Sequence, residues 1–236
     1  MMRLLPLVLL VCFHAIIVTA KAADLSSPPE SVATPTVAAL PLPVRKADSI
    51  YVFAGALSTR NMGSTANFDT NWPIGPNYDN YIVGAAYNHD FYSLYGFAVG
   101  GEVGLADRFG YFRQCCDPVI KSTSILNSPE FWFGPRFSFD GLTLFNTVRI
   151  GGAMTFGFSV TANSIGVERG REIDKNGSAR VIGYLGPEIF FALADYPEWE
   201  IVYRLHHRSG ANGTFGRMGE GYNANVLGLR YKFLPI

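Results

Sequence analysis

The sequence lacks an excess of charge of either sign. Its 19 basic and 19 acidic side chains cancel, and charged residues make up only 16% of the 236 positions. A surface that binds nucleic acid requires a basic excess, so this balance argues against a nucleic-acid partner. Disorder is excluded on other grounds, because 48% of the residues are hydrophobic and 14% are aromatic.

A long hydrophobic run is also lacking beyond the first twenty residues. Past Ala20 there is no apolar stretch of about 18 residues, so that part of the sequence predicts no transmembrane helix. Residues 1–20 have the layout of a secretory signal peptide, with Arg3 at the positive end and small residues near Ala20; an N-terminal anchor is disfavoured because the segment is short. Residues 21–48, rich in Ala, Pro and Ser, predict an extended periplasmic arm before a domain at 49–236.

Cysteine is scarce, and the common enzyme motifs are missing. Cys12 falls in the leader, which leaves the adjacent pair Cys115 and Cys116. Adjacent cysteines can close only a strained ring, and no nearby histidine completes a zinc site, so we assign this pair no function. The sequence has no Walker loop, no His-Glu-x-x-His, no Gly-x-Ser-x-Gly and no dinucleotide fingerprint, and we expect neither metal nor cofactor.

From residue 49 onward, apolar residues recur at every second position. The clearest case is 142–160, where the even positions are largely apolar and the odd positions are largely small or polar. This period of two is typical of β-strands with two unlike faces. On strand 94–106 we place the glycines at 100, 101 and 104 on the polar face, as packing positions. The pattern predicts eight strands, at 49–59, 79–88, 94–106, 129–139, 142–160, 179–194, 198–209 and 222–233.

The predicted connections alternate in length. Short ones are expected at 88–90, 140–141 and 194–197, and long ones at about 60–78, 107–128, 161–178 and 210–221. An even number of strands with short turns at one end and long loops at the other is typical of an outer-membrane barrel. The predicted fold is therefore all-β, an eight-stranded antiparallel transmembrane β-barrel in the bacterial outer membrane.

A soluble barrel of the lipocalin kind is the main alternative fold. Such a barrel keeps its apolar face inside and its charges outside. The membrane barrel is favoured because the charged face is otherwise made of small residues, as a narrow lumen filled with ion pairs requires, while the apolar face is rich in Phe and Tyr. The charged residues of that polar face are Glu102, Glu130, Arg136, Arg149, Glu188, Arg204 and Arg230.

Strand 198–209 ends in a way that suggests chemistry. Its odd positions run from Trp199 through apolar residues to His207 and Ser209, which places both polar side chains on the predicted lipid-facing surface. If the N-terminus is periplasmic, they lie at the outer end, level with the ester-linked acyl chains of outer-leaflet lipid. Residues two apart advance about 6.6 Å on one face, so the imidazole can reach the hydroxyl, as a Ser–His pair requires. His206 points to the opposite face, so the adjacent histidines do not form a metal site.

The segment Arg204–Gly210 (RLHHRSG), a Gly/Asn-rich loop and a closing strand ending in LRYKFLPI together resemble the lipid A 3-O-deacylases, the acyloxyacyl hydrolase family of eight-stranded outer-membrane barrels. The resemblance implies an esterase that removes a 3-hydroxyacyl chain from lipid A, with Ser209 as nucleophile and His207 as general base. The partners it implies are the outer membrane and the lipid A of outer-leaflet lipopolysaccharide. Whether the protein forms a homodimer is left open.

Two parts of the implied site are open. The family's acidic residue, which orients the base, corresponds by position to Asn225, and Glu220 in the preceding loop is the only carboxylate nearby; we favour Glu220 because loop length can absorb the offset. The family also has an Asn directly after the nucleophile, which helps to build the oxyanion hole, whereas this sequence has Gly210. Backbone N–H groups around Gly210, with Asn212 or Gly213, could substitute.

Two other functions stay open at this point. One is a non-enzymatic surface barrel of the Omp25 or small OmpA-like kind, acting in envelope integrity or adhesion through its long loops. The other, least favoured, is a soluble lipid-binding barrel.

Overall fold

The computed structural model describes residues 48–66, 78–113 and 121–233. The predicted signal peptide, nearly all of the predicted arm and the pair Cys115–Cys116 lie outside these residues. In the described part of the chain, neither helix is long and apolar enough to cross a membrane.

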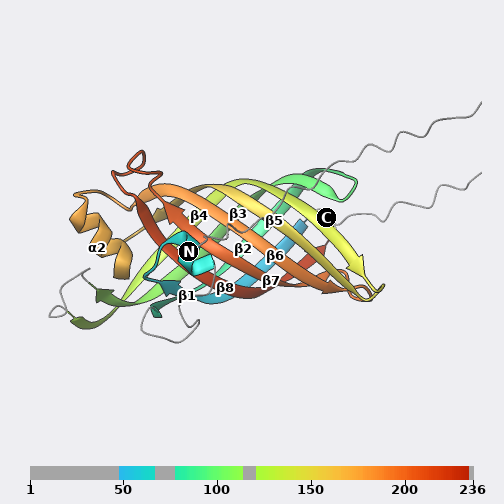
Figure 1. The fold of residues 1–236 in the computed structure, drawn as a ribbon, viewed down its shortest axis with the longest axis horizontal. Helices are drawn as coiled ribbons and strands as arrows, with labels where there is room; N and C mark the ends of the chain where they lie inside the picture. Colours follow the sequence, from blue (N-terminus) through green and yellow to red (C-terminus); the bar gives the residue numbers. More distant parts are fainter. Residues whose placement is uncertain (1–47, 67–77, 114–120, 234–236) are drawn as a thin grey trace, which may run out of the picture. The chain divides into compact units, whose positions relative to one another are not determined.

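Eight antiparallel strands close into one barrel in simple sequence order, with β8 paired to β1 (Figure 1). This confirms the predicted fold class. Among the described residues, two helices lie in the loops at one end of the barrel. The elements are β1 (Asp48–Ser58), α1 (Met62–Ala66), β2 (Tyr78–Leu94), β3 (Phe97–Arg113), β4 (Lys121–Leu144), β5 (Val148–Thr161), α2 (Gly166–Asp174), β6 (Val181–Leu193), β7 (Trp199–Ser209) and β8 (Glu220–Phe233).

Two of the three predicted short turns are wrong, for one shared reason. Residues 88–90 lie inside β2 and residues 140–141 inside β4, while the turns are formed by 95–96 and 145–147. Tyr95 and Gly96 both have positive φ, as the favoured two-residue hairpin turns require, and in the three-residue turn Phe145 and Asn146 have positive φ. Polar residues mark a turn in a soluble protein, but in a polar-lined barrel they also continue a strand. Irregularities in register near both sites absorb the extra residues. The third short turn, at 194–197, is confirmed.

The long connections also differ from prediction. Much of the expected loop 107–128 is strand, because β3 continues to Arg113 and β4 begins at Lys121. The expected loop 161–178 contains α2, a helix that the alternation analysis did not anticipate. Glu220 is the first residue of β8 instead of a loop residue.

The exposed apolar residues of the strands face outward, whereas most of the charged residues face the lumen, together with buried rings such as Tyr51, Trp132 and Phe190. On β3, for example, Val103 and Leu105 are 46% and 64% exposed, whereas Glu102 between its outward neighbours is 2% exposed. One predicted face assignment is wrong: Gly100 and Gly104 face the lumen, but Gly101 lies on the outer wall, where an added Cβ would meet only the ring of Phe91 and, at 3.9 Å, a backbone oxygen. A soluble lipid-binding barrel needs the opposite arrangement, so that alternative is excluded.

Ion pairs fill the middle of the lumen. Arg204, fully buried on β7, lies 2.5 Å from a carboxylate oxygen of Glu102 and 2.7 Å from one of Glu188. Glu188 also pairs with Arg136 at 2.5 Å and with Arg230 at 2.6 Å. Removing one partner of such a network leaves an uncompensated buried charge, at a cost of about 3–5 kcal/mol. The lumen is therefore a packed core.

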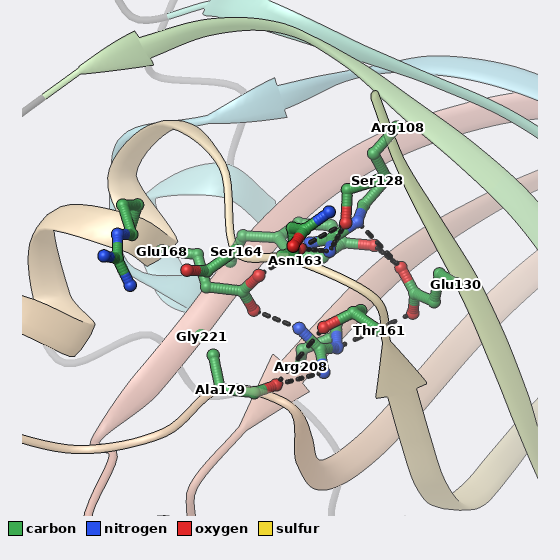
Figure 2. A network of polar contacts seen from close by, with 12 residues as sticks. Arg108, Ser128, Glu130, Thr161, Asn163, Ser164, Glu168, Ala179, Arg208 and Gly221 are labelled. Atoms are coloured by element: carbon green, nitrogen blue, oxygen red, sulfur yellow. Dashed lines mark hydrogen bonds and ion pairs between the residues drawn. The ribbon is translucent and has the colours of Figure 1, made fainter. Parts of the chain in front are cut away.

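The extracellular end of the lumen is closed by α2. Its residue Glu168 is fully buried and is bound by two arginines, Arg108 from β3 at 2.7 Å and Arg208 from β7 (Figure 2). Glu130 on β4 lies beneath them, 3.5 Å from Arg108 and 3.0 Å from His206. This network fixes the loop that contains α2 to the strands that carry the candidate site.

Candidate active site

The outer wall carries a row of polar side chains where β7 meets β8. We call this row the β7–β8 seam; its members are Tyr203, His207, Ser209, Asn223 and Asn225. Farther along the same face the outward positions are apolar and exposed, for example Ile201 at 54% and Leu229 at 49%, whereas Leu205, between Tyr203 and His207, is apolar but only 2% exposed. On β7 the residues between the seam members, such as Arg204 and Arg208, are buried in the lumen, as predicted. Because neighbouring residues of a strand face opposite sides, the seam members face outward.

His207 contacts an amide across the strand pair. Residues His207 and Asn223 are register partners, and His207 Nδ1 lies 2.5 Å from Asn223 Oδ1. The orientation of the amide follows from its second bond, because Asn223 Nδ2 donates to the carbonyl oxygen of Arg60 at 2.8 Å. Oδ1 therefore accepts from Nδ1–H, which leaves the lone pair of the neutral imidazole on Nε2. This is the tautomer that a general base needs.

Ser209 lies two residues beyond His207, after an irregularity in the β7–β8 register. Its Oγ accepts a hydrogen bond from the Ala211 amide at 3.1 Å and is 3.5 Å from the Gly219 carbonyl oxygen. Within the described residues, no hydrogen bond joins Ser209 to His207. The two side chains are neighbours on the same strand, but the hydroxyl is turned toward the 210–219 turn.

The two residues considered for orienting His207 bind elsewhere. Glu220 accepts a hydrogen bond from the Met62 amide at 3.1 Å and lies 3.5 Å from Arg171 of α2. Asn225 accepts from the Tyr203 hydroxyl at 2.8 Å and donates to the Thr65 carbonyl oxygen at 3.1 Å. The structure brings Asn223 to the imidazole, a residue that the sequence analysis did not consider. The sequence shows that Asn223 shares the odd numbering of the outward residues of β8. It does not show which residue of β7 pairs with Asn223.

The segment 59–66, which contains α1, folds over the seam. The backbone of this segment binds Asn223, Asn225 and Glu220, and α1 packs against β7 and β8. As a result His207 is only 5% exposed and Asn223 is fully buried, although both belong to the outer wall. The seam is therefore shielded from the bilayer by the protein itself.

The turn at 210–219 uses most of the amides considered for an oxyanion hole. The Gly210 N–H donates to the Gly219 carbonyl at 2.7 Å, and the Gly213 N–H donates to the Met218 carbonyl at 2.6 Å. Asn212 is exposed at the turn, with a φ of 56°. Of the three positions, Asn212 alone retains an unused polar side chain on the surface of this turn, among the described residues.

Glu172, on α2 outside the bilayer, has a carboxyl group with a lowered pKa. Burial alone raises the pKa of this carboxyl, but hydrogen bonds from Ser164, the Ala179 amide and Arg169 outweigh it and hold the pKa below its ordinary value of 4.5. Across the described ranges, no group of three or more His, Cys, Asp and Glu side chains is placed to hold a metal ion.

These features define the class of the protein. A closed barrel of eight antiparallel strands, with an apolar outer wall, a charged and filled lumen, and short turns at one end only, is a transmembrane β-barrel of the bacterial outer membrane.

No known family and no curated protein sequence matches the chain. Its structure is similar to that of the outer membrane enzyme PagL, with a TM-score of 0.43 and 12% identity over 80% of this chain and 99% of that one. It is also similar to the outer membrane protein Ail of Yersinia pestis, with a TM-score of 0.38 and 15% identity over 80% and 100% of the two chains. A third similar structure is OprG from Pseudomonas aeruginosa, with a TM-score of 0.39 and 11% identity over 80% and 97%. Identities this low assign no activity.

Proposed function

We propose that this protein is an outer-membrane esterase that removes an ester-linked 3-hydroxyacyl chain from the lipid A of lipopolysaccharide. The observation that carries the proposal is the hydrogen-bonded pair His207–Asn223 on the outer wall, beside Ser209 at the extracellular end of β7. The pair places a general base with an available Nε2 next to a hydroxyl group on the outer wall, which is the side from which a lipid ester would approach.

The chemistry follows the roles that the tautomer allows. His207 Nε2 takes the proton of Ser209 as its Oγ attacks the ester carbonyl. The bond between the carbonyl carbon and the sugar oxygen then breaks, and His207 returns the proton to that oxygen. A water molecule, deprotonated by the same imidazole, hydrolyses the acyl-serine and releases a 3-hydroxy fatty acid. Neither redox change nor cofactor enters this sequence of steps.

Asn223 is the orienting residue in this proposal. Its Oδ1 holds the Nδ1–H tautomer, as the carboxylate does in a Ser–His–Asp triad. As a neutral group it does not offset the charge of the imidazolium that forms during attack. Glu220, the register partner of Ser209, is the carboxylate nearest in the pairing to the nucleophile, and it supplies negative charge at this end of the seam.

Two movements are needed before the reaction. Ser209 has to rotate from the 210–219 turn toward Nε2, which is common between unliganded and substrate-bound enzymes. The segment 59–66 has to move away from the seam so that an acyl ester can reach it.

The covering of the seam also supports a second candidate, a non-enzymatic surface barrel. If the segment 59–66 stays in place, the buried amides of Asn223 and Asn225 serve to anchor the first extracellular loop. The long loops would then carry a structural or adhesive role.

One experiment separates the two candidates. The wild type and the variants Ser209→Ala, His207→Ala and Asn223→Ala are expressed in a Gram-negative host, and its lipid A is weighed by mass spectrometry. Loss of one hydroxyacyl chain with the wild type, and with neither Ser209→Ala nor His207→Ala, supports the esterase. Unmodified lipid A from a wild-type barrel that is folded and heat-modifiable in the outer membrane supports the structural candidate.

A further inference from the structure

The outer wall has a hollow across β2, β3 and β4, on the side of the barrel opposite the β7–β8 seam. Its volume is about 530 Å³, within the roughly 300–1,000 Å³ typical of small-molecule sites, and its lining is almost entirely apolar. The residues that shape it are Tyr87, His89, Phe91, Gly101, Phe133 and Pro135. We call it the Gly101–Pro135 groove.

The groove exists because two facing outward positions carry little side chain. Gly101 and Pro135 are register partners on β3 and β4, and their outward neighbours Val103 and Phe133 are 46% and 44% exposed. Phe91, on the β2 side, is 71% exposed and forms one flank. The hollow is thus a gap between the larger side chains of Phe91, Val103 and Phe133.

Close packing does not explain the glycine at position 101. A Cβ at Gly101 would meet the ring of Phe91 at 3.4 Å and the nearest backbone oxygen at 3.9 Å, so a side chain would fit in the open space. Gly100 and Gly134 differ, because a Cβ there would lie 2.1 Å and 1.7 Å from backbone oxygens. Those two glycines are required by the packing of the strands, whereas Gly101 leaves the groove open.

The β2 edge of the groove carries a polar pair, because His89 is the register partner of Gly101. His89 Nδ1 lies 2.6 Å from Asp48 Oδ1, and the Tyr87 hydroxyl donates to the same oxygen at 2.6 Å. Asp48 is the first residue of β1, at the end of the barrel with the short turns, which is the periplasmic end. The Asp48 side chain is 5% exposed and that of His89 is 39% exposed, so the imidazole, with Nε2 directed away from Asp48, is the polar surface that a ligand meets.

We propose that the Gly101–Pro135 groove binds one acyl chain of an inner-leaflet glycerophospholipid, whose phosphate and ester region lies against His89. The occupant follows from the surroundings: the groove opens to the bilayer, its wall is apolar, and the ionisable pair at its β2 edge lies toward the periplasmic end of the barrel, the side of the inner-leaflet headgroups. Asp48 is already satisfied by His89 and Tyr87, whereas the 39% exposed imidazole of His89 still presents a polar surface that a headgroup can contact. This site is separate from the β7–β8 seam and does not depend on the esterase.

The test uses the full-length barrel, purified in detergent and titrated with palmitoyl-oleoyl-phosphatidylethanolamine under native mass spectrometry. The wild type should retain one phospholipid per chain. Gly101→Leu fills the groove and should weaken retention about tenfold or more, since the burial of two methylene groups already corresponds to such a factor. Ala85→Leu is the matched control, because it adds the same side chain to another exposed outward position, on β2.

The headgroup contact is tested with the diacylglycerol that has the same two chains. The wild type should bind the phospholipid more tightly than the diacylglycerol, and His89→Ala should abolish that preference while the groove stays open. Absence of a retained phospholipid in the wild type, or equal retention by Gly101→Leu and Ala85→Leu in folded, heat-modifiable barrels, would overturn the proposal. Equal binding of both lipids by the wild type would overturn the role of His89.

Discussion

His207 and Asn223 form a hydrogen-bonded pair across β7 and β8, with 2.5 Å between Nδ1 and Oδ1, on the wall of the barrel that faces the bilayer. The pair sets the tautomer of the imidazole with a neutral amide where a carboxylate is the more familiar partner. The neutral charge of Asn223 and the covering of His207 by the segment 59–66 lead to the next two predictions.

Asn223→Asp should increase esterase activity. A carboxylate in this position compensates the imidazolium that forms when Ser209 is deprotonated, so kcat should rise by about an order of magnitude and the acid limb of the pH–rate profile should move to higher pH. The measurement is the release of 3-hydroxy fatty acid from purified lipid A as a function of pH. Asn225→Asp, which adds the same charge to the same face without contacting His207, should not give this gain. An identical profile for wild type and Asn223→Asp would remove Asn223 from the mechanism.

Uncapping α1 should expose His207. The Asn61 side chain accepts a hydrogen bond from the Ser64 amide at 2.9 Å, and losing such a cap costs about 1 kcal/mol, or roughly a fivefold increase in opening. Asn61→Ala should therefore speed the modification of His207 by diethylpyrocarbonate, followed by peptide mass spectrometry. His89, already 39% exposed, serves as the internal reference and should react at the same rate in both proteins.

Arg204→Met should destabilise the barrel by about 3–5 kcal/mol. The change leaves Glu102 with only the more distant guanidinium of Arg136, at 4.0 Å, and Glu188 loses one of its three arginine partners, all of them buried in the lumen. Urea unfolding in lipid vesicles, read as the shift from folded to unfolded migration, gives the value. The matched substitution Arg180→Met removes an exposed arginine and should change the stability by no more than about 0.5 kcal/mol. Comparable losses in both variants would show that the lumen network carries no special weight.

Glu168→Gln should loosen the loop that contains α2. The neutral amide cannot balance Arg108 and Arg208, so the loop should open more often and be cut more quickly by trypsin added to whole cells. Asp174→Asn, an exposed change on the same helix, is the control. Equal cleavage rates for the two variants would contradict the anchoring role of Glu168.

The same loop should weaken in acid. The pKa of Glu172 is lowered in the folded protein, so its carboxylate contributes stability that is fully present above the unfolded value of 4.5 and is lost as the pH falls below it through the folded pKa. Cleavage of the loop by pepsin should therefore increase as the pH is lowered in steps below 4.5. Glu172→Gln should be cut faster at the upper end of this range and show a flatter dependence on pH.

The barrel could be predicted because outward and inward residues alternate along its strands. The outward placement of His207 and the inward placement of Arg204 follow from a period of two alone, and both agree with the structure. The turns at 95–96 and 145–147 were missed because a lumen accepts the same polar residues that mark turns elsewhere.

The contacts of the site depended on information that no single strand contains. Asn223 reaches His207 through the pairing of β7 with β8, and that register includes an irregularity after His207 that alternation does not reveal. The cover over the seam comes from a segment about 160 residues away in sequence, whose contacts are made by backbone atoms of Arg60, Met62 and Thr65. Backbone contacts place no demand on side-chain identity, so they leave no pattern to read.

The packed lumen has one more consequence. With Arg204 and its carboxylates across the middle and Glu168 held in the extracellular mouth, the described part of the barrel offers ions no path along its axis, and a bilayer that contains it should stay electrically silent under an applied voltage. Whatever this protein exchanges with its surroundings has to travel laterally, through the hydrocarbon and along the outside of its own wall.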